Sequence, residues 1–253
     1  KFGVPDFGIG LHSSPTIKAG QLGISDGYTM ANAEMIDIDV FGVGSHGASP
    51  HSSIDPVVLS SMIIMDLQTI VSRNVKPIDD AVITVGAVQG GTVGNIIPDE
   101  VKLKLTVRTF KEDVRMMIRK RIREVCNGAA MAAGLPEEKW PVVHFPDSFT
   151  PANYNDTDLT NKIIATVSRT IGGENVVQAE PQLVAEDFAR YGSTEHDVPT
   201  VLFWLGTVSQ EKIDNNNLPG LHSPYYYPEP EKSIETGVNV VSSILLDLFN
   251  ESM

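Results

Sequence analysis

The chain contains one cysteine in 253 residues, so no disulfide can form within it, and a reducing compartment such as the cytoplasm suits it. It is also poor in positive charge: it has 19 Lys and Arg residues and 32 Asp and Glu residues, which gives a formal net charge of −13. This excess of negative charge repels polyanions, so the sequence disfavours nucleic acid and membrane surfaces as partners.

Long hydrophobic runs are lacking as well. No apolar run approaches the roughly 20 residues that span a bilayer, and the start shows neither an initiator Met nor a signal-peptide pattern.

What is present is the composition of a folded protein. Hydrophobic residues make up 42% and charged residues 20% of the chain, which excludes disordered, collagen-like and disulfide-rich classes. The length is sufficient for one large core or for two smaller ones. We therefore expect a soluble, cytoplasmic protein.

Residues from about 33 to 147 show the pattern of a compact α+β domain. Alternating apolar residues from Ile36 to Val40 predict a half-buried strand, and Asp55-Pro56 marks the start of a helix that ends near Ser72. The order strand, helix, strand, strand, helix, strand is typical of ferredoxin-like folds. The remaining elements are strands at 81–88 and 101–110, an amphipathic helix around Ile118 to Ala129 whose arginines lie mostly off the apolar stripe, and a strand at 142–145.

The sequences on either side of this domain predict a second one. An apolar strand is expected from Val4 to Leu11, and a proline-containing linker near residue 150 precedes further helix and strand patterns. The simplest architecture is one α/β domain, residues 1–32 and 148–253, into which residues 33–147 are inserted. The later elements are a helix at 159–171, a buried strand at 200–205 and a terminal helix at 234–249.

Three of the six histidines stand in settings that suit chemistry. His12 ends an apolar strand, while His46 and His222 lie in loops rich in Gly, Ser or Pro, where a ring nitrogen can face a cleft. Taken one at a time, each is more often a hydrogen-bonded core or surface residue. The sequence contains no compact HExxH or paired CxxC motif that would identify a metal site directly.

Together with their neighbours, these histidines carry a resemblance. The segments that match, in order along nearly the whole chain, are FGIGLH (7–12), GVGSHGASPH (42–51), DP (55–56), LQTIVSR (67–73), GNIIPD (94–99), TVRTF (106–110), AEDF (185–188) and LHSP (221–224). This ordered set resembles the aminoacylase-like metallopeptidases. It is most similar to the amidohydrolase branch, which contains hippurate hydrolases, N-acyl amino acid deacylases and plant auxin-conjugate hydrolases.

The resemblance implies part of a two-metal catalytic α/β domain with an inserted ferredoxin-like lid that also pairs subunits. His12 and His222 match metal ligands, one for each ion. Two ions about 3.5–4 Å apart can hold a hydroxide nucleophile and polarise a scissile carbonyl. Zinc or manganese is expected, with cobalt and nickel as alternatives, because imidazole binds all four.

The resemblance also implies roles for four other residues. His46 matches a lid histidine that reaches the active site of a partner subunit and stabilises the oxyanion, and Asn95 and Arg108 match lid residues that face the substrate. A guanidinium at Arg108 suits a substrate carboxylate, although without the resemblance it would be interpreted as an exposed strand charge. Glu186 matches a loop near the substrate, and an acidic residue at the start of a helix is an equal alternative.

The function predicted is hydrolysis of the amide bond of N-acyl amino acids or small peptides by metal-activated water, in a homodimer paired through the lid. The family's other metal ligands and its general-base glutamate precede the position of His12 and have no counterpart here. The sequence therefore predicts a carboxyl-terminal part that is inactive and binds metal weakly by itself. Two alternatives stay open: a non-catalytic dimerisation or binding module, and a dipeptidase or carboxypeptidase of the same superfamily.

Overall fold

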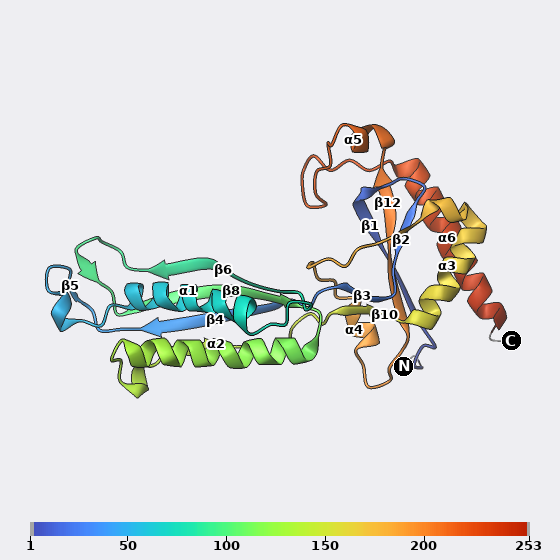
Figure 1. Ribbon diagram of the computed structural model, residues 1–253. Helices are drawn as coiled ribbons and strands as arrows, with labels where there is room; N and C mark the ends of the chain where they lie inside the picture. The colour runs from blue at the N-terminus through green and yellow to red at the C-terminus, as the bar shows by residue number, and fades with distance from the viewer. Residues whose placement is uncertain (1–2, 252–253) are drawn as a thin grey trace. The chain divides into compact units, whose positions relative to one another are not determined.

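The structure is a computed structural model that describes residues 3–251, and it divides into two compact units. We call residues Ala31–Ala152 with Leu183–Ala185 the inserted unit. The flanking unit comprises residues 3–30, Asn153–Gln182 and 186–251 (Figure 1). Within the described part of the chain, no helix is both long and apolar enough to cross a membrane.

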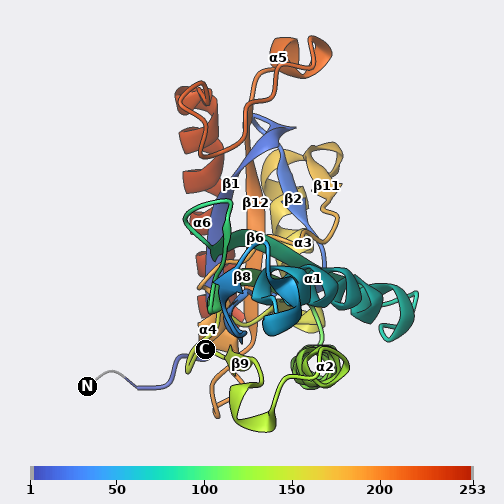
Figure 2. The same cartoon turned by 90° about the vertical axis from the view of Figure 1, so that its left-hand side faces the viewer.

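The inserted unit is a four-stranded antiparallel sheet covered by two helices, as the sequence predicts. The strands lie in the order β6-β8-β4-β9, the order of a ferredoxin-like fold. Buried apolar residues of both central strands and of both helices form one core, so the helices share a face of the sheet (Figure 2). The elements are β4 Glu34–Phe41, α1 Pro56–Arg73, β6 Ala81–Gly90, β8 Glu100–Thr109, α2 Glu112–Ala132 and β9 Val142–His144, with short pieces β5 Ser45–His46, η1 Pro50–Ser52, β7 Ile96–Ile97 and η2 Glu137–Lys139.

Local sequence explains where these elements begin and which faces they bury. The Asp55 side chain accepts hydrogen bonds from the N–H groups of Val57 and Val58 and so caps α1, whose first residue is Pro56. In β4 and β8, buried and more exposed residues alternate, which is the period of a sheet with one covered face. The fold class predicted from the sequence is confirmed.

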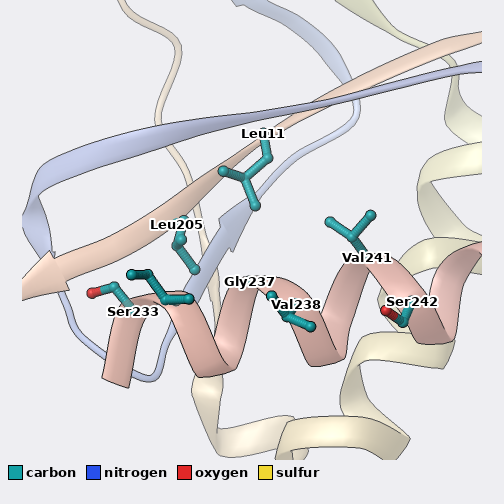
Figure 3. Close-up of a pocket in the computed structure, with 8 residues that line it drawn as sticks. Leu11, Leu205, Ser233, Gly237, Val238, Val241 and Ser242 are labelled. Carbon is teal, nitrogen blue, oxygen red and sulfur yellow. The ribbon is translucent and has the colours of Figure 1, made fainter. Parts of the chain in front are cut away.

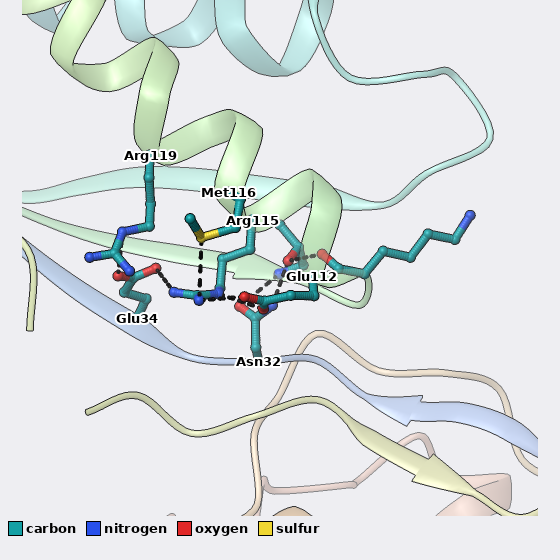
Figure 4. A network of polar contacts seen from close by, with 8 residues as sticks. Asn32, Glu34, Glu112, Arg115, Met116 and Arg119 are labelled. Carbon is teal, nitrogen blue, oxygen red and sulfur yellow. Dashed lines mark hydrogen bonds and ion pairs between the residues drawn. The ribbon is translucent and has the colours of Figure 1, made fainter. Parts of the chain in front are cut away.

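One end of the inserted unit buries a charged network (Figure 4). The Glu34 side chain is 0% exposed and the Arg115 side chain 5%, and Nη1 of Arg115 lies 3.1 Å from Oε2 of Glu34. Arg115 also donates to both carboxylate oxygens of Glu112, and its guanidinium stacks 3.8 Å from the centre of the Phe149 ring. Arg119 approaches the second oxygen of Glu34 at 3.4 Å. Burial of one carboxylate is thus compensated by two guanidinium groups.

The flanking unit is a mixed sheet with helices on one face. Its strands follow the order β1-β12-β2-β11, in which β1 is parallel to β12 and β2 is parallel to β11. Helices α3 and α6 pack side by side on this sheet around Phe203 and Leu22 (Figures 1 and 2). The elements are β1 Gly8–Lys18, β2 Leu22–Ile24, β3 Gly27–Met30, β10 Asn153–Asn155, α3 Thr157–Ile171, η3 Gly173–Asn175, β11 Val176–Gln178, α4 Ala189–Gly192, β12 Thr200–Val208, α5 Gln210–Asp214 and α6 Pro230–Glu251.

The first strand differs from the expectation. The sequence predicts a strand from Val4 to Leu11 that ends at His12, whereas β1 begins at Gly8 and continues to Lys18. The reason is its partner: β12 pairs with β1 over Gly8–Ser14 in unbroken parallel register, beyond the apolar residues that mark the strand in the sequence. His12 therefore lies inside a strand, not at its end.

Strand β1 is an edge of its sheet, and a shallow apolar groove lies beside it (Figure 3). The groove has a volume of about 480 Å³ and is formed by Leu11, Leu205 and one side of α6. Ile234 and Val238 of that helix are 64% and 59% exposed. This face of the flanking unit is thus apolar and uncovered among the described residues.

Candidate metal and substrate site

His12 is held in one orientation by its neighbours in the sheet. It pairs in register with Trp204 of β12, and the two rings meet edge to face with centroids 5.0 Å apart. Its Nδ1 lies 2.8 Å from the carbonyl oxygen of Ser13. Because a carbonyl oxygen only accepts, Nδ1 carries the proton, and in the neutral ring Nε2 is left with its lone pair. This is the tautomer that a metal ligand requires.

Glu186 lies next to that nitrogen. Its Oε2 is 3.5 Å from Nε2 of His12, and the two side chains are 27% and 31% exposed. The loop that carries Glu186 is packed onto β1 through Phe188, at a point where the strand has no side chain. A Cβ on Gly10 would lie 2.9 Å from two carbons of the Phe188 ring, so a glycine there allows the close approach.

His222 lies in the loop between α5 and α6, where its side chain is exposed. Tyr226 ties this loop to the sheet: its hydroxyl lies 2.6 Å from Oγ1 of Thr207, which donates to the carbonyl oxygen of Ser14 at 2.6 Å. Ser14 is two residues beyond His12 on the same strand. The loop of His222 is therefore anchored beside the strand that holds His12.

The side chains of His12, Glu186 and His222 are of the chemical kind that binds a divalent cation, but too few of them lie close together to hold one. Imidazole nitrogen and carboxylate oxygen are ordinary ligands of zinc and manganese. Among residues 3–251, however, no three His, Cys, Asp or Glu side chains come close enough together to hold an ion. His12 and Glu186 provide two donors, and His222 does not join them in a cluster.

In the inserted unit the structure brings His46 and Asn95 together. The short strand β5 pairs with β7, so that His46 lies opposite Ile96, and the N–H of Gly47 donates to the carbonyl oxygen of Asn95 at 2.8 Å. Nδ1 of His46 accepts a hydrogen bond from the N–H of Ala48 at 3.1 Å. Nδ1 is thus unprotonated, and in the neutral ring Nε2 carries a proton that it can donate outward.

Arg108 lies at the other end of the same sheet. It pairs with Val82 near the last residue of β8, while the β5–β7 pair adjoins the first residues of that strand. The eight residue-to-residue steps from Glu100 to Arg108 correspond to about 26 Å of strand. One inserted unit therefore does not bring Arg108 to His46 and Asn95. Within the described part of the chain, no carboxylate forms an ion pair with Arg108, although it is only partly exposed.

Comparison with known proteins finds similar sequences. Residues 30–134 match the family described as peptidase dimerisation domain. An N-acetyldiaminopimelate deacetylase of Bacillus pumilus is 36% identical over 239 residues, which are 94% of this chain and 59% of that protein. An N-acetylcysteine deacetylase of Bacillus subtilis is 34% identical over 205 residues, 81% of this chain and 51% of the relative.

Solved structures are similar over nearly the whole chain. A Bacillus subtilis protein described as a dinuclear metal-binding peptidase from the M20 family has a TM-score of 0.72 and 25% identity, covering 95% of this chain and 56% of that one. The resemblance to the aminoacylase-like metallopeptidases is therefore confirmed. Most of the inserted unit matches the peptidase dimerisation domain, and the chain is similar to curated deacetylases and to a peptidase of the M20 family. It spans between 51% and 59% of the length of these two curated relatives.

Some residues of this site cannot be identified from the sequence. Trp204 opposes His12 only because β12 pairs with β1, and the sequence does not reveal which strands pair. Phe188 is part of the AEDF segment, but its packing on Gly10 depends on the path of the loop. The sequence has three consecutive tyrosines at 225–227, which indicate that the loop of His222 is packed. Only the contacts show that Tyr226 is the residue that anchors it.

Proposed function

We propose that the protein carrying these residues is a metal-dependent amidohydrolase that removes the acyl group from N-acyl amino acids. The observation that carries the proposal is the orientation of the His12 ring. Its Nδ1 donates a hydrogen bond to the carbonyl oxygen of Ser13, and its Nε2 faces the carboxylate of Glu186. Homology to two deacetylases of N-acetylated amino acids supports it. The single buried cysteine is compatible with the cytoplasmic location predicted from the sequence.

In this proposal, His12 and His222 each hold one of two divalent ions, zinc or manganese, with cobalt and nickel as alternatives. When bound, the two ions supply a hydroxide nucleophile and polarise the amide carbonyl. The neighbouring residues of the chain hold these two metal-binding histidines in place. Trp204 and the Ser13 carbonyl orient His12, and Tyr226 positions the loop of His222.

The inserted unit would supply the groups that recognise the substrate. Arg108, without a carboxylate partner in the described structure, would pair with the free carboxylate of the amino acid. His46 would donate from Nε2 to the developing oxyanion, and Asn95 beside it would bind the substrate amide. Glu186 lies beside His12, which favours a place at the metal over one at the substrate alone.

The separation of these groups has a consequence for the assembly. Because Arg108 and His46 lie at opposite ends of one sheet, they would act on the same substrate only from different chains. We therefore propose a homodimer in which Arg108 of one chain works with the partner's His46 and the partner's Asn95. A small peptide with a free carboxylate would satisfy the same contacts, so a dipeptidase activity is the second candidate.

Mixed dimers test this arrangement. Chains with His46→Ala and chains with Arg108→Ala should each be inactive on N-acetyl amino acids. Random mixing should restore about one quarter of the wild-type activity, since half of the dimers are mixed and one of their two sites is intact. The matched control mixes His46→Ala with Asn95→Ala, and it should restore nothing, because both defects lie on the same end of the lid.

The experiment requires the gene product that contains these 253 residues, loaded with zinc or manganese. Failure of the first mixture to recover would contradict the division of roles between chains. Turnover that persists after chelation would rule out the metal-dependent mechanism. A dimer that binds no metal and hydrolyses no amide would instead support the non-catalytic module.

A further inference from the structure

We propose that Glu186 is a metal ligand, which shares one divalent ion with His12 through Oε2. This goes beyond the role at the substrate that the sequence predicts for it. The inference rests on the proposed function, because it takes His12 as a ligand. It assigns to that ion a second donor from this chain.

The first argument is chemical. The Ser13 carbonyl holds the proton of His12 on Nδ1, so a neutral ring presents a lone pair at Nε2. The atom that faces it, Oε2 of Glu186, is a carboxylate oxygen and also presents lone pairs. Two acceptors that face each other repel unless a cation lies between them. That cation is a proton or a metal ion, and both nitrogen and oxygen are of the kind that zinc and manganese bind.

The second argument is geometric. Zinc binds imidazole nitrogen and carboxylate oxygen at about 2.1 Å, and two ligands of a tetrahedral ion are then about 3.4 Å apart. The observed separation of Nε2 and Oε2 is 3.5 Å. A direct hydrogen bond between a charged donor and a carboxylate is usually shorter, about 2.7–2.9 Å. The spacing therefore suits two donors on one ion better than a pair that shares a proton.

The third argument is that the pair is held from both sides. His12 is fixed by the Ser13 carbonyl and the Trp204 ring. The loop of Glu186 is held by Phe188, whose ring packs against the buried cluster that includes Leu202 and Trp204 and lies close to the backbone of Gly10. The N–H of Phe188 also donates to Oε1 of Glu186 at 3.5 Å. Asp187, the next residue, is exposed and serves as a natural comparison. A preorganised pair of donors is what a metal site needs, since the ligands lose little freedom on binding.

Zinc titration of the gene product that contains these 253 residues, at pH 7.5, tests the proposal, with binding followed by calorimetry and by the ¹⁵N shifts of the His12 ring. In the wild type, zinc should shift Nε2 of His12 and leave Nδ1 protonated. Glu186→Gln removes the charge and keeps the size, and it should weaken zinc binding at His12 by at least about tenfold. The matched control Asp187→Asn should bind as the wild type does.

Two further variants separate the possible failures. His12→Ala and His222→Ala should each weaken zinc binding. If neither does, the metal assignment in the proposed function is wrong. If His12→Ala weakens binding and Glu186→Gln does not, the function stands and Glu186 is not a ligand. A His12 ring that carries protons on both nitrogens at pH 7.5, and that zinc does not deprotonate, would also overturn the proposal, because a proton would then be the bridging cation.

Discussion

At the residue scale, Tyr226 is the clearest link between the loop of His222 and the sheet. Its hydroxyl donates to Thr207, which is 4% exposed and has already given its own proton to Ser14. Tyr226→Phe should therefore lower the free energy of unfolding by about 1 kcal/mol and loosen the loop. Hydrogen exchange over residues 209–229 should become faster. Tyr227→Phe is the matched control, because that side chain is 74% exposed, and equal effects of both changes would contradict the anchor role.

Cys126 offers a prediction about pH. It is fully buried in the core of the inserted unit, and burial raises the pKa of its thiol to about 12. The thiol of the unfolded chain ionises near its ordinary pKa of about 8.5, so only the unfolded state gains a thiolate between these values. The contribution of Cys126 to stability is therefore complete below pH 8 and decreases as the pH rises towards 12. Urea unfolding from pH 7 to 10 should show this decrease, and Cys126→Ala should remove that component.

The same burial should protect the thiol from reagents. At pH 8 the folded chain should react with a thiol-specific disulfide reagent far more slowly than the unfolded chain, since the thiolate is the reactive form. Rapid labelling of the native chain at that pH would show that Cys126 is accessible after all.

At the element scale, the charged network at one end of the inserted unit joins α2 to β4. Removing Arg115 alone leaves Glu34 buried with only the longer contact to Arg119. Arg115→Met should therefore cost about 3–5 kcal/mol of stability. The double variant Glu34→Leu with Arg115→Met should recover much of that loss, because no buried charge remains. Urea denaturation of the four proteins in this cycle provides the measurement, and additive losses would contradict the coupling.

This network also shows where prediction from the sequence ends. The elements of the inserted unit follow from local patterns: alternation in β4 and β8, and the Asp55-Pro56 start of α1. Arg115, by contrast, is expected among the polar residues of α2 and is in fact buried. Its burial depends on a carboxylate 81 residues earlier in the chain, which no local pattern reveals.

The candidate site, too, is predictable from the sequence only in part. His12, His46 and His222 can be identified as candidates from the strand and loops in which they lie, and the ordered motifs suggest their roles. The tautomers of His12 and His46 depend on hydrogen bonds that only the fold creates. The distance between Arg108 and His46 likewise follows from strand register, which periodicity does not determine.

At the scale of the whole molecule, two exposed apolar surfaces among the described residues suit the pairing of chains. One is the groove between β1 and α6, with Ile234 and Val238 (Figure 3). The other lies on the outer face of α1, where Val58, Met62 and Met65 are 57%, 42% and 69% exposed. These three residues are spaced so that they share one side of the helix.

We expect the α1 face to pair the subunits, because it lies within the segment that matches a peptidase dimerisation domain. It also adjoins β6, an edge strand whose outer backbone groups are available for a second chain. Equivalent faces can meet across a two-fold axis, which is the commonest symmetry of homodimers. Met62→Glu together with Met65→Glu should place charges in that interface and convert the dimer to monomers. Val238→Glu, a matched change on α6, should leave the dimer intact. Sedimentation equilibrium distinguishes the two surfaces, since a dimer broken by Val238→Glu alone would assign the pairing to the flanking unit.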